Sequence, residues 1–259
     1  MDVWREKLTV RIGCVDSSDR LNLWSIFDFF QEAATSHAAV LGVGREEMTN
    51  AGQAWVLSRF SLFVKRRPFY GETIEVSTWP RRCEKLFAYR DYEIKDAEGA
   101  VLVSGRGAWL LLDKEKRRPL RPQTLVETLP ANEGLDAFPA APSGLEVREN
   151  LTKIMQRNAL YSDLDYYGHA NNARYIQWIQ DAADIDILTN ADQFRLDINY
   201  LNEVLPGDLI EIWAAPLDGG ADNDYYPSPP GPAFFYEGKK AGSDKVMFRA
   251  ELHTGLYGA

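Results

Sequence analysis

The sequence predicts an α+β protein made of two tandem copies of one unit, each an antiparallel sheet wrapped around a long central helix. The first observation behind this prediction is an internal repeat: Gln31–Ala34 resembles Gln180–Ala183, and Gly71–Val76 resembles Gly207–Ile212. The second is the order of elements, because each copy starts with a strand, continues with one long helix and ends with several strands. Two diverged copies of one unit explain both observations.

Each copy contains one long helix, which the spacing of its apolar residues predicts. The first helix is expected over Trp24–Leu41 and the second over Asn172–Leu188. In both segments apolar residues recur at i, i+3, i+7 and i+11, which places them on one helical face. In the first segment these residues are Phe27, Phe30, Ala34 and Ala38. In the second they are Ile176, Ile179, Ala183 and Ile187.

Alternating apolar residues predict the strands that form the sheet around each helix. In the first copy they cover Leu8–Cys14, Trp55–Lys65, Thr73–Trp79, Leu86–Ile94 and Val101–Leu112. In the second copy they cover Met155–Tyr161, Phe194–Tyr200, Leu209–Ala214, Ala233–Tyr236 and Lys245–Leu252. We expect the two sheets to join edge to edge, because such a join covers strand edges that would otherwise be exposed.

The chain divides into an N-terminal unit at residues 1–130, a linker at 131–144 and a C-terminal unit at 145–259. Five prolines between residues 119 and 143 indicate the linker, since proline interrupts helices and central strands. The segment Pro216–Pro232, rich in Gly, Pro and Asp, predicts a long connection between two strands.

The composition is that of an ordinary globular protein, with 45% apolar and 26% charged residues among 259. Its net charge of −9 argues against nucleic acid as a partner. Residues 1–130 carry 20 Lys and Arg against 18 Asp and Glu, a balance of +2. Residues 131–259 carry 9 against 20, a balance of −11. The basic clusters of the first half, such as Lys114–Arg121, are either solvated surface or a docking face for an acidic partner.

Targeting signals and metal motifs are missing from the sequence. No segment approaches the ~18 consecutive apolar residues that span a bilayer, so no membrane partner is expected. The N-terminus lacks the apolar region of a signal peptide and the only cysteines are Cys14 and Cys83, so we expect a cytoplasmic protein. No histidine and cysteine cluster has the spacing of a metal site, and we expect no metal or other cofactor.

One histidine has neighbours that suit catalysis. Asp165 and His169 lie just before the second long helix, whose N-cap is Asn171 or Asn172. The free N–H groups and the positive dipole at such a helix start can polarise a carbonyl or hold an oxyanion. Gly168 allows a tight turn or the close approach of a ligand. This arrangement suits acyl transfer; the alternative is an acidic turn with capping asparagines and no catalysis.

The sequence around this histidine resembles the signature of hotdog-fold thioesterases. The matching positions are Asp163, Asp165, Gly168, His169, Asn171, Asn172, Tyr175 and Trp178. Further blocks in the first half resemble the acyl-acyl carrier protein thioesterases: Phe30–Ala34, Trp55–Arg59, Gly71–Glu72, Thr78–Pro80 and Arg117–Pro119. This resemblance covers most of the chain and implies a double hotdog, in which two hotdog units follow one another.

The resemblance implies that Asp165, His169 and Glu203 are catalytic. Glu203 and His169 would together orient and deprotonate a water molecule, while Asp165 would fix His169 or act itself as base or nucleophile. The chain departs from the family at two positions. Tyr167 stands where the family usually has asparagine, and we include it among the candidate catalytic residues. Val204 stands where plant members often have cysteine, which excludes a cysteine nucleophile there.

The candidate substrate-binding residues come from both halves. Backbone amides at the second helix start, from the segment that holds Gly168, Asn171 and Asn172, would bind the oxyanion with help from Tyr167. Aromatic and aliphatic residues of the first half are the candidates to line an acyl pocket, with plain core packing as the alternative for each. They are Trp55 and Phe30, together with Phe27, Phe29, Leu57 and Phe60.

The repeat places a single active site in the C-terminal unit. Aligning the two copies puts Asp16 opposite Asp165, but Arg20 opposite His169 and Arg67 opposite Glu203. The N-terminal unit thus lacks two of the three candidate groups, and we expect it to supply the acyl-chain pocket without catalysing the reaction.

The predicted function is a thioester hydrolase that releases free fatty acids from acyl carrier protein in fatty acid biosynthesis. Acyl carrier proteins are acidic, which suits the basic clusters of the first half. An acyl-coenzyme A thioesterase is the alternative enzyme, and a non-catalytic acyl-thioester sensor is the alternative from another class. The chain length of the substrate and the existence of a homodimer stay open.

Overall fold

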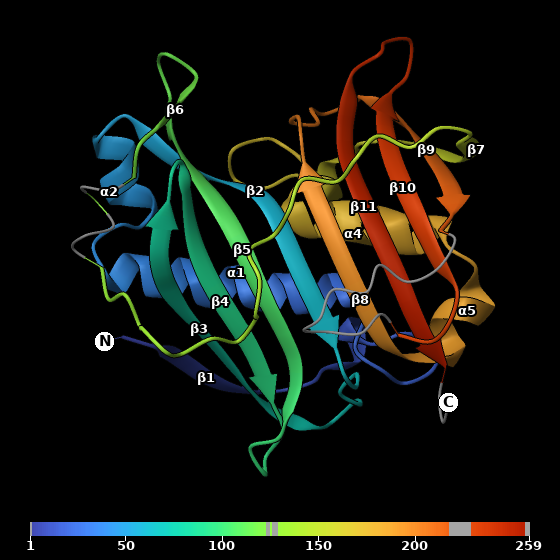
Figure 1. Ribbon diagram of the computed structural model, residues 1–259, viewed down its shortest axis with the longest axis horizontal. Helices are drawn as coiled ribbons and strands as arrows, with labels where there is room; N and C mark the ends of the chain where they lie inside the picture. Colours follow the sequence, from blue (N-terminus) through green and yellow to red (C-terminus); the bar gives the residue numbers. More distant parts are fainter. Residues whose placement is uncertain (1, 123–124, 126–128, 218–228, 257–259) are drawn as a thin grey trace.

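The strands form one large antiparallel sheet that wraps around two helices (Figure 1). The computed structural model describes all residues except 1, 123–124, 126–128, 218–228 and 257–259. The strands of the first half are β1 (Trp4–Thr9), β2 (Gln53–Val64), β3 (Thr73–Glu84), β4 (Phe87–Lys95), β5 (Val101–Asp113) and β6 (Arg118–Leu120). Those of the second half are β7 (Thr152–Asn158), β8 (Ala191–Tyr200), β9 (Leu209–Pro216), β10 (Ala233–Lys240) and β11 (Val246–Leu256).

The two halves meet at the centre of this sheet. Its order is β1-β3-β4-β5-β2-β8-β11-β10-β9-β7, with β6 added beside β5. The join is the antiparallel pair β2–β8, which runs from Arg59 opposite Asn199 to Val64 opposite Phe194. The expected edge-to-edge junction of two sheets is therefore confirmed.

The helices lie on the concave side of the sheet. They are α1 (Leu23–Val40), α2 (Arg45–Asn50), α4 (Asn172–Ala182) and α5 (Ile185–Asn190), and the short 3₁₀ turns are η1 (Ile12–Cys14) and η2 (Tyr161–Asp163). The long helices α1 and α4 lie across the inner face of the two halves (Figure 1). The expected first helix agrees with α1 to within one residue at each end.

The second long helix was expected to continue to Leu188, and this is wrong. Helix α4 ends at Ala182, and α5 starts anew at Ile185. The break lies at Asp184, whose carboxylate accepts hydrogen bonds from the backbone N–H groups of Asp186 and Ile187. Aspartate favours such caps over helix interiors, so the apolar spacing continues across two helices instead of one.

Two strand predictions are also shifted along the chain. The expected strand Leu8–Cys14 lies at Trp4–Thr9, because β1 ends where its partner β3 begins, at the pair Thr9–Thr73. The expected strand Met155–Tyr161 lies at Thr152–Asn158, and Tyr161 belongs to η2. Most of the expected connection Pro216–Pro232 lies outside the described residues.

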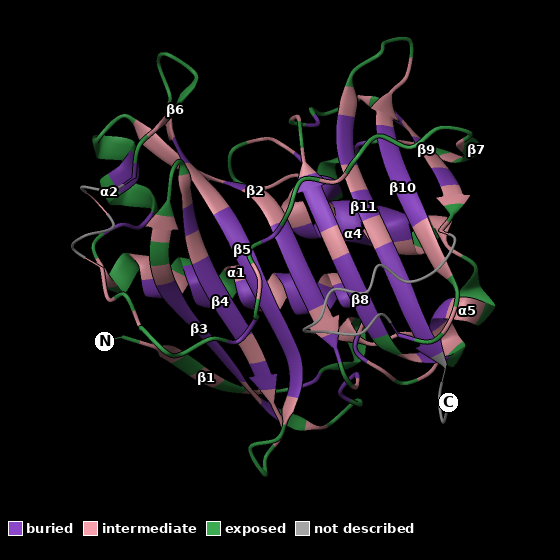
Figure 2. Cartoon of the chain, viewed as in Figure 1, coloured by how far each residue is buried: buried purple, intermediate pink, exposed green. Residues whose placement is uncertain are grey.

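The core fills the space between the sheet and the two long helices. Buried residues form the middle of most strands and the inner faces of α1 and α4 (Figure 2). On α1 these include Ile26 and Phe30, and on α4 Ile176 and Ile179, each at most 1% exposed. At roughly 25 cal/mol per Å² of apolar surface, this burial is the main contribution that stabilises the fold.

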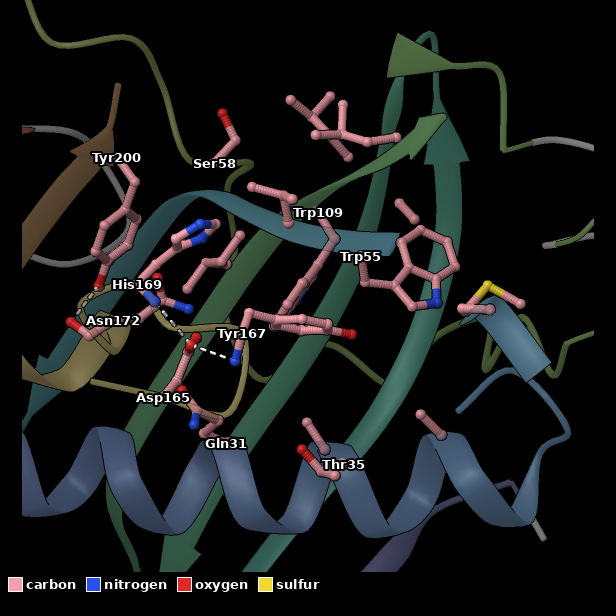
Figure 3. Close-up of a pocket in the computed structure, with 18 of the residues that line it drawn as sticks. Gln31, Thr35, Trp55, Ser58, Trp109, Asp165, Tyr167, His169, Asn172 and Tyr200 are labelled. Atoms are coloured by element: carbon pink, nitrogen blue, oxygen red, sulfur yellow. Dashed lines mark hydrogen bonds between the residues drawn. The ribbon is translucent and has the colours of Figure 1, made fainter. Parts of the chain in front are cut away.

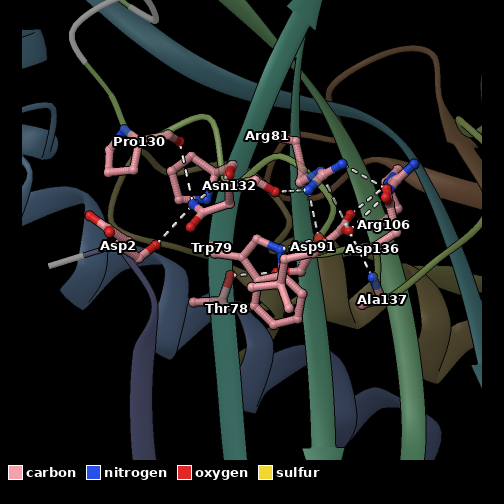
Figure 4. A network of polar contacts seen from close by, with 12 residues as sticks. Asp2, Thr78, Trp79, Arg81, Asp91, Arg106, Pro130, Asn132, Asp136 and Ala137 are labelled. Atoms are coloured by element: carbon pink, nitrogen blue, oxygen red, sulfur yellow. Dashed lines mark hydrogen bonds and ion pairs between the residues drawn. The ribbon is translucent and has the colours of Figure 1, made fainter.

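The linker crosses the convex face of the sheet and is tied to it by a buried carboxylate (Figure 4). Asp91 on β4 is fully buried and accepts two hydrogen bonds from Arg106, at 2.6 and 2.7 Å, and one from the backbone N–H of Ala137 at 3.0 Å. Asp136 accepts hydrogen bonds from Arg106 and from Arg81. The linker is therefore anchored to the outside of the first half, while the division of the chain at 131–144 stays a prediction.

Candidate active site

The loop between η2 and α4 holds Asp165 and His169 in a closed turn. The backbone N–H of Asp165 donates to the carbonyl of His169 at 2.8 Å, and that of Gly168 donates to the carbonyl of Asp165 at 3.0 Å. The Asp165 carboxylate accepts from the backbone N–H groups of Tyr167 (2.8 Å) and His169 (3.3 Å). Gly168 has a φ of +81°, a conformation that glycine adopts without strain. Asp165 thus positions His169 through the backbone of the turn.

The helix start offers one free backbone donor. Asn171 is the N-cap, and its side chain accepts from the N–H of Ala173 at 2.9 Å. The N–H of Asn171 donates to Asp163 and that of Gly168 to Asp165, so neither is available to an oxyanion. Of the three expected backbone donors, only Asn172 has an N–H without a partner among the described residues. Asn172 also lines the cavity beside His169.

Glu203 lies next to His169 because the segment after β8 is tied to α4. The Nδ1 atom of His169 is 3.6 Å from the Oε1 atom of Glu203. The Tyr175 hydroxyl accepts from the N–H of Val204 at 3.2 Å and lies 3.5 Å from the carbonyl of Asn202. Burial raises the pKa of Tyr175 well above its usual value, which keeps this hydroxyl neutral. Tyr175 therefore holds the backbone on both sides of Glu203.

A cavity of about 610 Å³ connects these residues to the first half of the chain. Asp165, His169 and Asn172 lie together on one side of it, and Trp55 lies on the other (Figure 3). Tyr167 and Glu203 line it too. The walls between are formed by small or apolar residues of α1, α2 and the sheet: Ala34, Thr35, Ala38, Met48, Leu57, Ala88 and Trp109. This part of the wall is mainly apolar and suits a chain of methylene groups.

Phe30 does not line the cavity, contrary to expectation. It is 1% exposed, and its ring packs against Tyr92 and Phe60 at centroid distances of 4.9 and 6.2 Å. The other aromatic candidates, Phe27, Phe29 and Phe60, are likewise absent from the described lining, whereas Trp55 and Leu57 belong to it. On α1 the cavity lies against the small side chains Ala34, Thr35 and Ala38, whereas Phe27 and Phe30 are packed in the core. The spacing of Ala34 and Ala38, one turn apart, could have indicated this face.

Two tyrosines at the cavity are covered by cations from the first half. The rings of Tyr166 and Tyr167 are 4.5 Å apart between centroids. The Arg45 guanidinium lies 4.0 Å from the centroid of Tyr166, and the Lys114 ammonium lies 5.8 Å from that of Tyr167. Burial, followed by the neighbouring Tyr167, raises the pKa of Tyr166 to about 12. The candidate site therefore combines residues of both halves.

In the first half, the positions equivalent to the catalytic candidates form a structural contact. Asp16 accepts a hydrogen bond from Arg67, which is 1% exposed and also donates to the carbonyls of Leu188 and Ala191. Arg20 lies 3.8 Å from Asp192. These side chains tie the two halves together and do not line the cavity.

Two family models match the two halves of the chain. Residues 1–126 match the acyl-ACP thioesterase N-terminal domain, and residues 148–229 match the acyl-ACP thioesterase C-terminal domain. The chain belongs to the acyl-ACP thioesterase family. The resemblance that the sequence indicated is therefore confirmed. Val204, beside the candidate catalytic residue Glu203, is fully buried in the core.

Individual relatives support the family and the fold. A palmitoyl-acyl carrier protein thioesterase of Cuphea hookeriana is 24% identical over 242 residues, which cover 86% of this chain and 57% of that protein. The chain thus spans little more than half the length of the curated relatives it matches. The acyl-ACP thioesterase of Bacteroides thetaiotaomicron superposes with a TM-score of 0.83 at 24% identity over 97% of both chains. The 12:0-ACP thioesterase of Umbellularia californica superposes with a TM-score of 0.82 at 20% identity, over 98% of this chain and 94% of that one. The predicted double hotdog is confirmed.

The described residues contain neither a candidate metal site nor a helix that could span a membrane. Within the described residues, no group of three or more His, Cys, Asp or Glu side chains is placed to hold a metal ion. The helices in this part of the chain are all too short or too polar to cross a membrane.

Proposed function

We propose that this family member is a thioester hydrolase that releases free fatty acids from acyl carrier protein. One observation carries the proposal: His169, Glu203 and the free N–H of Asn172 meet at a cavity whose walls include many apolar side chains. A group that activates water, a donor for an oxyanion and a pocket for an acyl chain are the parts that thioester hydrolysis needs.

The geometry assigns a role to each group. Glu203 beside Nδ1 of His169 favours a proton on Nδ1, so Nε2 can accept a proton from water. The water oxygen forms a bond to the thioester carbon, and the N–H of Asn172 donates to the developing oxyanion. Collapse of this intermediate breaks the carbon–sulfur bond, and the proton on His169 moves to the sulfur. The products are a free fatty acid and the thiol of the carrier.

Asp165 acts as a positioning residue in this scheme. Its carboxylate accepts two backbone N–H groups of the turn that carries His169, and these contacts occupy its Oδ1 atom. Its Oδ2 atom takes no part in these contacts and Asp165 lines the cavity, so a role as base or nucleophile is the alternative for this residue. Tyr167 also lines the cavity, and its hydroxyl can donate one hydrogen bond to the substrate.

The experiment is thiol release by the purified protein from acyl chains of several lengths, on acyl carrier protein and on coenzyme A. We expect His169→Ala and Glu203→Ala each to lower kcat at least about 100-fold, which is the usual effect of removing a general base. Glu98→Ala, in the exposed turn between β4 and β5, is the matched control and keeps full activity.

The outcomes separate the alternatives. Faster hydrolysis of acyl-coenzyme A than of acyl-acyl carrier protein would make coenzyme A the carrier in this proposal. Tight binding of acyl thioesters without turnover on any substrate would overturn the hydrolase and leave an acyl-thioester sensor.

A further inference from the structure

The wall of the acyl cavity contains a buried cation. Arg90 lies on β4 opposite Pro80 and Gly107, and it belongs to the lining of the cavity. It is 8% exposed. A buried arginine is unexpected in such a wall, because cavities that hold methylene groups are lined mainly by apolar side chains.

Arg90 has only neutral hydrogen-bond partners. Its Nη1 atom is 3.1 Å from Nδ1 of His37 and 3.3 Å from Oγ1 of Thr78, and both partners are fully buried. Because a guanidinium can only donate, Nδ1 of His37 must accept, which makes that imidazole neutral. No carboxylate of the described residues lies within 4.0 Å of Arg90.

The other buried arginines differ from Arg90 in this respect. Arg67 pairs with Asp16, Arg106 with Asp91 at 2.6 Å, and Arg195 with Asp197 at 3.0 Å. A buried charge without an opposite charge is costly, so proteins seldom keep one without a ligand or a function. Burial lowers the pKa of Arg90, and the hydroxyl of Tyr92 opposes this shift.

Arg90 lies on a strand of the cavity wall that is two strands away from β2, on the side away from β8. Leu57 on β2, Trp109 on β5 and Ala88 on β4 lie in register across the sheet, and all three line the cavity. Arg90 is two residues beyond Ala88 and therefore on the same face of β4. Neighbouring strands are about 4.8 Å apart, so β4 lies roughly 10 Å from β2, and β2 is the strand beside β8 and the catalytic residues.

We propose that Arg90 makes this enzyme selective for acyl chains that carry an oxygen atom in their distal half, as a hydroxyl, oxo or carboxylate group. The inference rests on the proposed function, because it assumes that the cavity holds the acyl chain of the thioester. An oxygen acceptor beside Arg90 receives a charge-assisted hydrogen bond. A plain methyl-ended chain of the same length covers the guanidinium without offering it a partner.

The test is the ratio of kcat/KM values for pairs of acyl thioesters of equal length, with and without an ω-hydroxyl group. A second series carries an ω-carboxylate in place of the hydroxyl and tells a neutral from an anionic ligand. At the chain length that reaches Arg90 we expect a ratio of roughly 10 to 100 in favour of the oxygenated chain, from the usual strength of a hydrogen bond to a charged group. In Arg90→Met the ratio falls to about 1.

The control is Leu57→Met, a volume-conserving change in the apolar wall that keeps the ratio even if turnover changes. Arg90→Lys is the second variant at the site: it keeps a cation and retains part of the preference, should the methionine variant fail to fold. A ratio of 1 or less in the unaltered protein, at every length and for both oxygenated series, overturns the inference without any variant.

The failure of the proposed function would look different. Hydrolysis of the plain thioesters by the unaltered protein tests that function, whereas the ratio tests the role of Arg90. If no thioester is hydrolysed, binding of free ω-hydroxy and plain fatty acids is compared by the fluorescence of Trp55 and Trp109, which line the cavity. Equal affinities for the two acids then overturn the inference.

Discussion

At the scale of single residues, the position of Glu203 depends on a side chain outside the sequence motif that contains it. The side chain of Glu203 is more than half exposed, so burial of this side chain does not fix its position. Its backbone is held by the Tyr175 hydroxyl, which accepts from the N–H of Val204 and lies close to the carbonyl of Asn202. The distance between Glu203 and His169 is thus set by a tyrosine on helix α4.

The variant Tyr175→Phe is expected to lower kcat about tenfold, with a smaller effect on KM. Loss of the hydroxyl leaves the buried N–H of Val204 without a partner, which costs about 1–3 kcal/mol of stability and frees the segment around Glu203. The measurement is steady-state kinetics together with denaturant unfolding. Tyr236→Phe is the control, since Tyr236 is a buried tyrosine that does not line the cavity. An unchanged kcat in Tyr175→Phe would show that Glu203 needs no such support.

His253 makes the stability of the fold depend on pH. It is 2% exposed on β11, and its Nδ1 atom has no hydrogen-bond partner among the described residues. Burial lowers the pKa of His253, and the charge of Arg195 adds to this shift. As the pH falls below about 6.5, the unfolded chain binds a proton that the folded chain resists, so stability falls with pH.

We expect His253→Gln to weaken this dependence, by up to about 1.4 kcal/mol for each pH unit below 6.5. The measurement is the free energy of unfolding in denaturant at pH 7.5 and at pH 5.5, for both proteins. The result is the difference in the free energy of unfolding between the two pH values, because the substitution also changes packing at both. An identical pH dependence in the two proteins would assign the loss to other groups.

At the scale of helices and strands, the sequence predicts those element boundaries that depend on residues close by in the chain. The apolar spacing predicts α1 to within one residue at each end, although Asp28 lies inside this helix; the Asp28 carboxylate accepts a hydrogen bond from Arg174 and starts no new helix. The spacing fails across Asp184, where a carboxylate that can bind backbone N–H groups starts a new helix. It also fails at β1, whose end is set by the start of β3, a partner more than sixty residues away.

The candidate site shows the same difference between local features, which the sequence predicts, and long-range contacts, which it does not. A short motif places Asp165, His169 and the helix start, because all of them belong to one turn. The lining of the cavity depends on which side chains face one another across the fold. A run of aromatic residues cannot show that, and Phe30 therefore proved to be part of the core. Trp109 and Arg90 lie on strands that carry no motif, and only the sheet register brings them to the cavity.

The attachment of the linker to the sheet can be tested through Asp91. Asp91→Ala removes the carboxylate that Arg106 and the N–H of Ala137 share, and leaves the Arg106 guanidinium buried with only Asp136. Breaking a buried ion pair costs about 3–5 kcal/mol, and we expect this loss together with faster proteolysis within 131–144. Denaturant unfolding and limited proteolysis are the measurements. Asp136→Ala is the matched control, with a much smaller loss because Asp136 is half exposed. Equal effects of the two variants would contradict the role of Asp91.

At the scale of the whole molecule, the two halves divide the work that the cavity performs. The second half supplies His169, Glu203 and the helix start, and the first half supplies most of the apolar wall. The charges are divided too, with a balance of +2 in residues 1–130 and −11 in residues 131–259. Arg45 and Arg117 of the first half line the cavity, and Lys114 lies 5.8 Å from the ring centroid of Tyr167, which also lines it. All three are exposed, so an acidic carrier that delivers an acyl chain meets positive charge there.

This arrangement predicts that the positive charge at the cavity affects the docking of the carrier protein and not the hydrolysis of the thioester. We expect the double variant Lys114→Glu and Arg117→Glu to lower kcat/KM for acyl carrier protein substrates about tenfold at low salt. The same acyl chain on neutral pantetheine loses little, since its reaction does not depend on steering between charged surfaces. The difference shrinks at 0.5 M salt, at which the Debye length is shorter than the ~10 Å found at 0.1 M. Lys153→Glu, on β7 in the second half, is the control. An equal loss on both substrates would mean that these cations shape the cavity and take no part in docking.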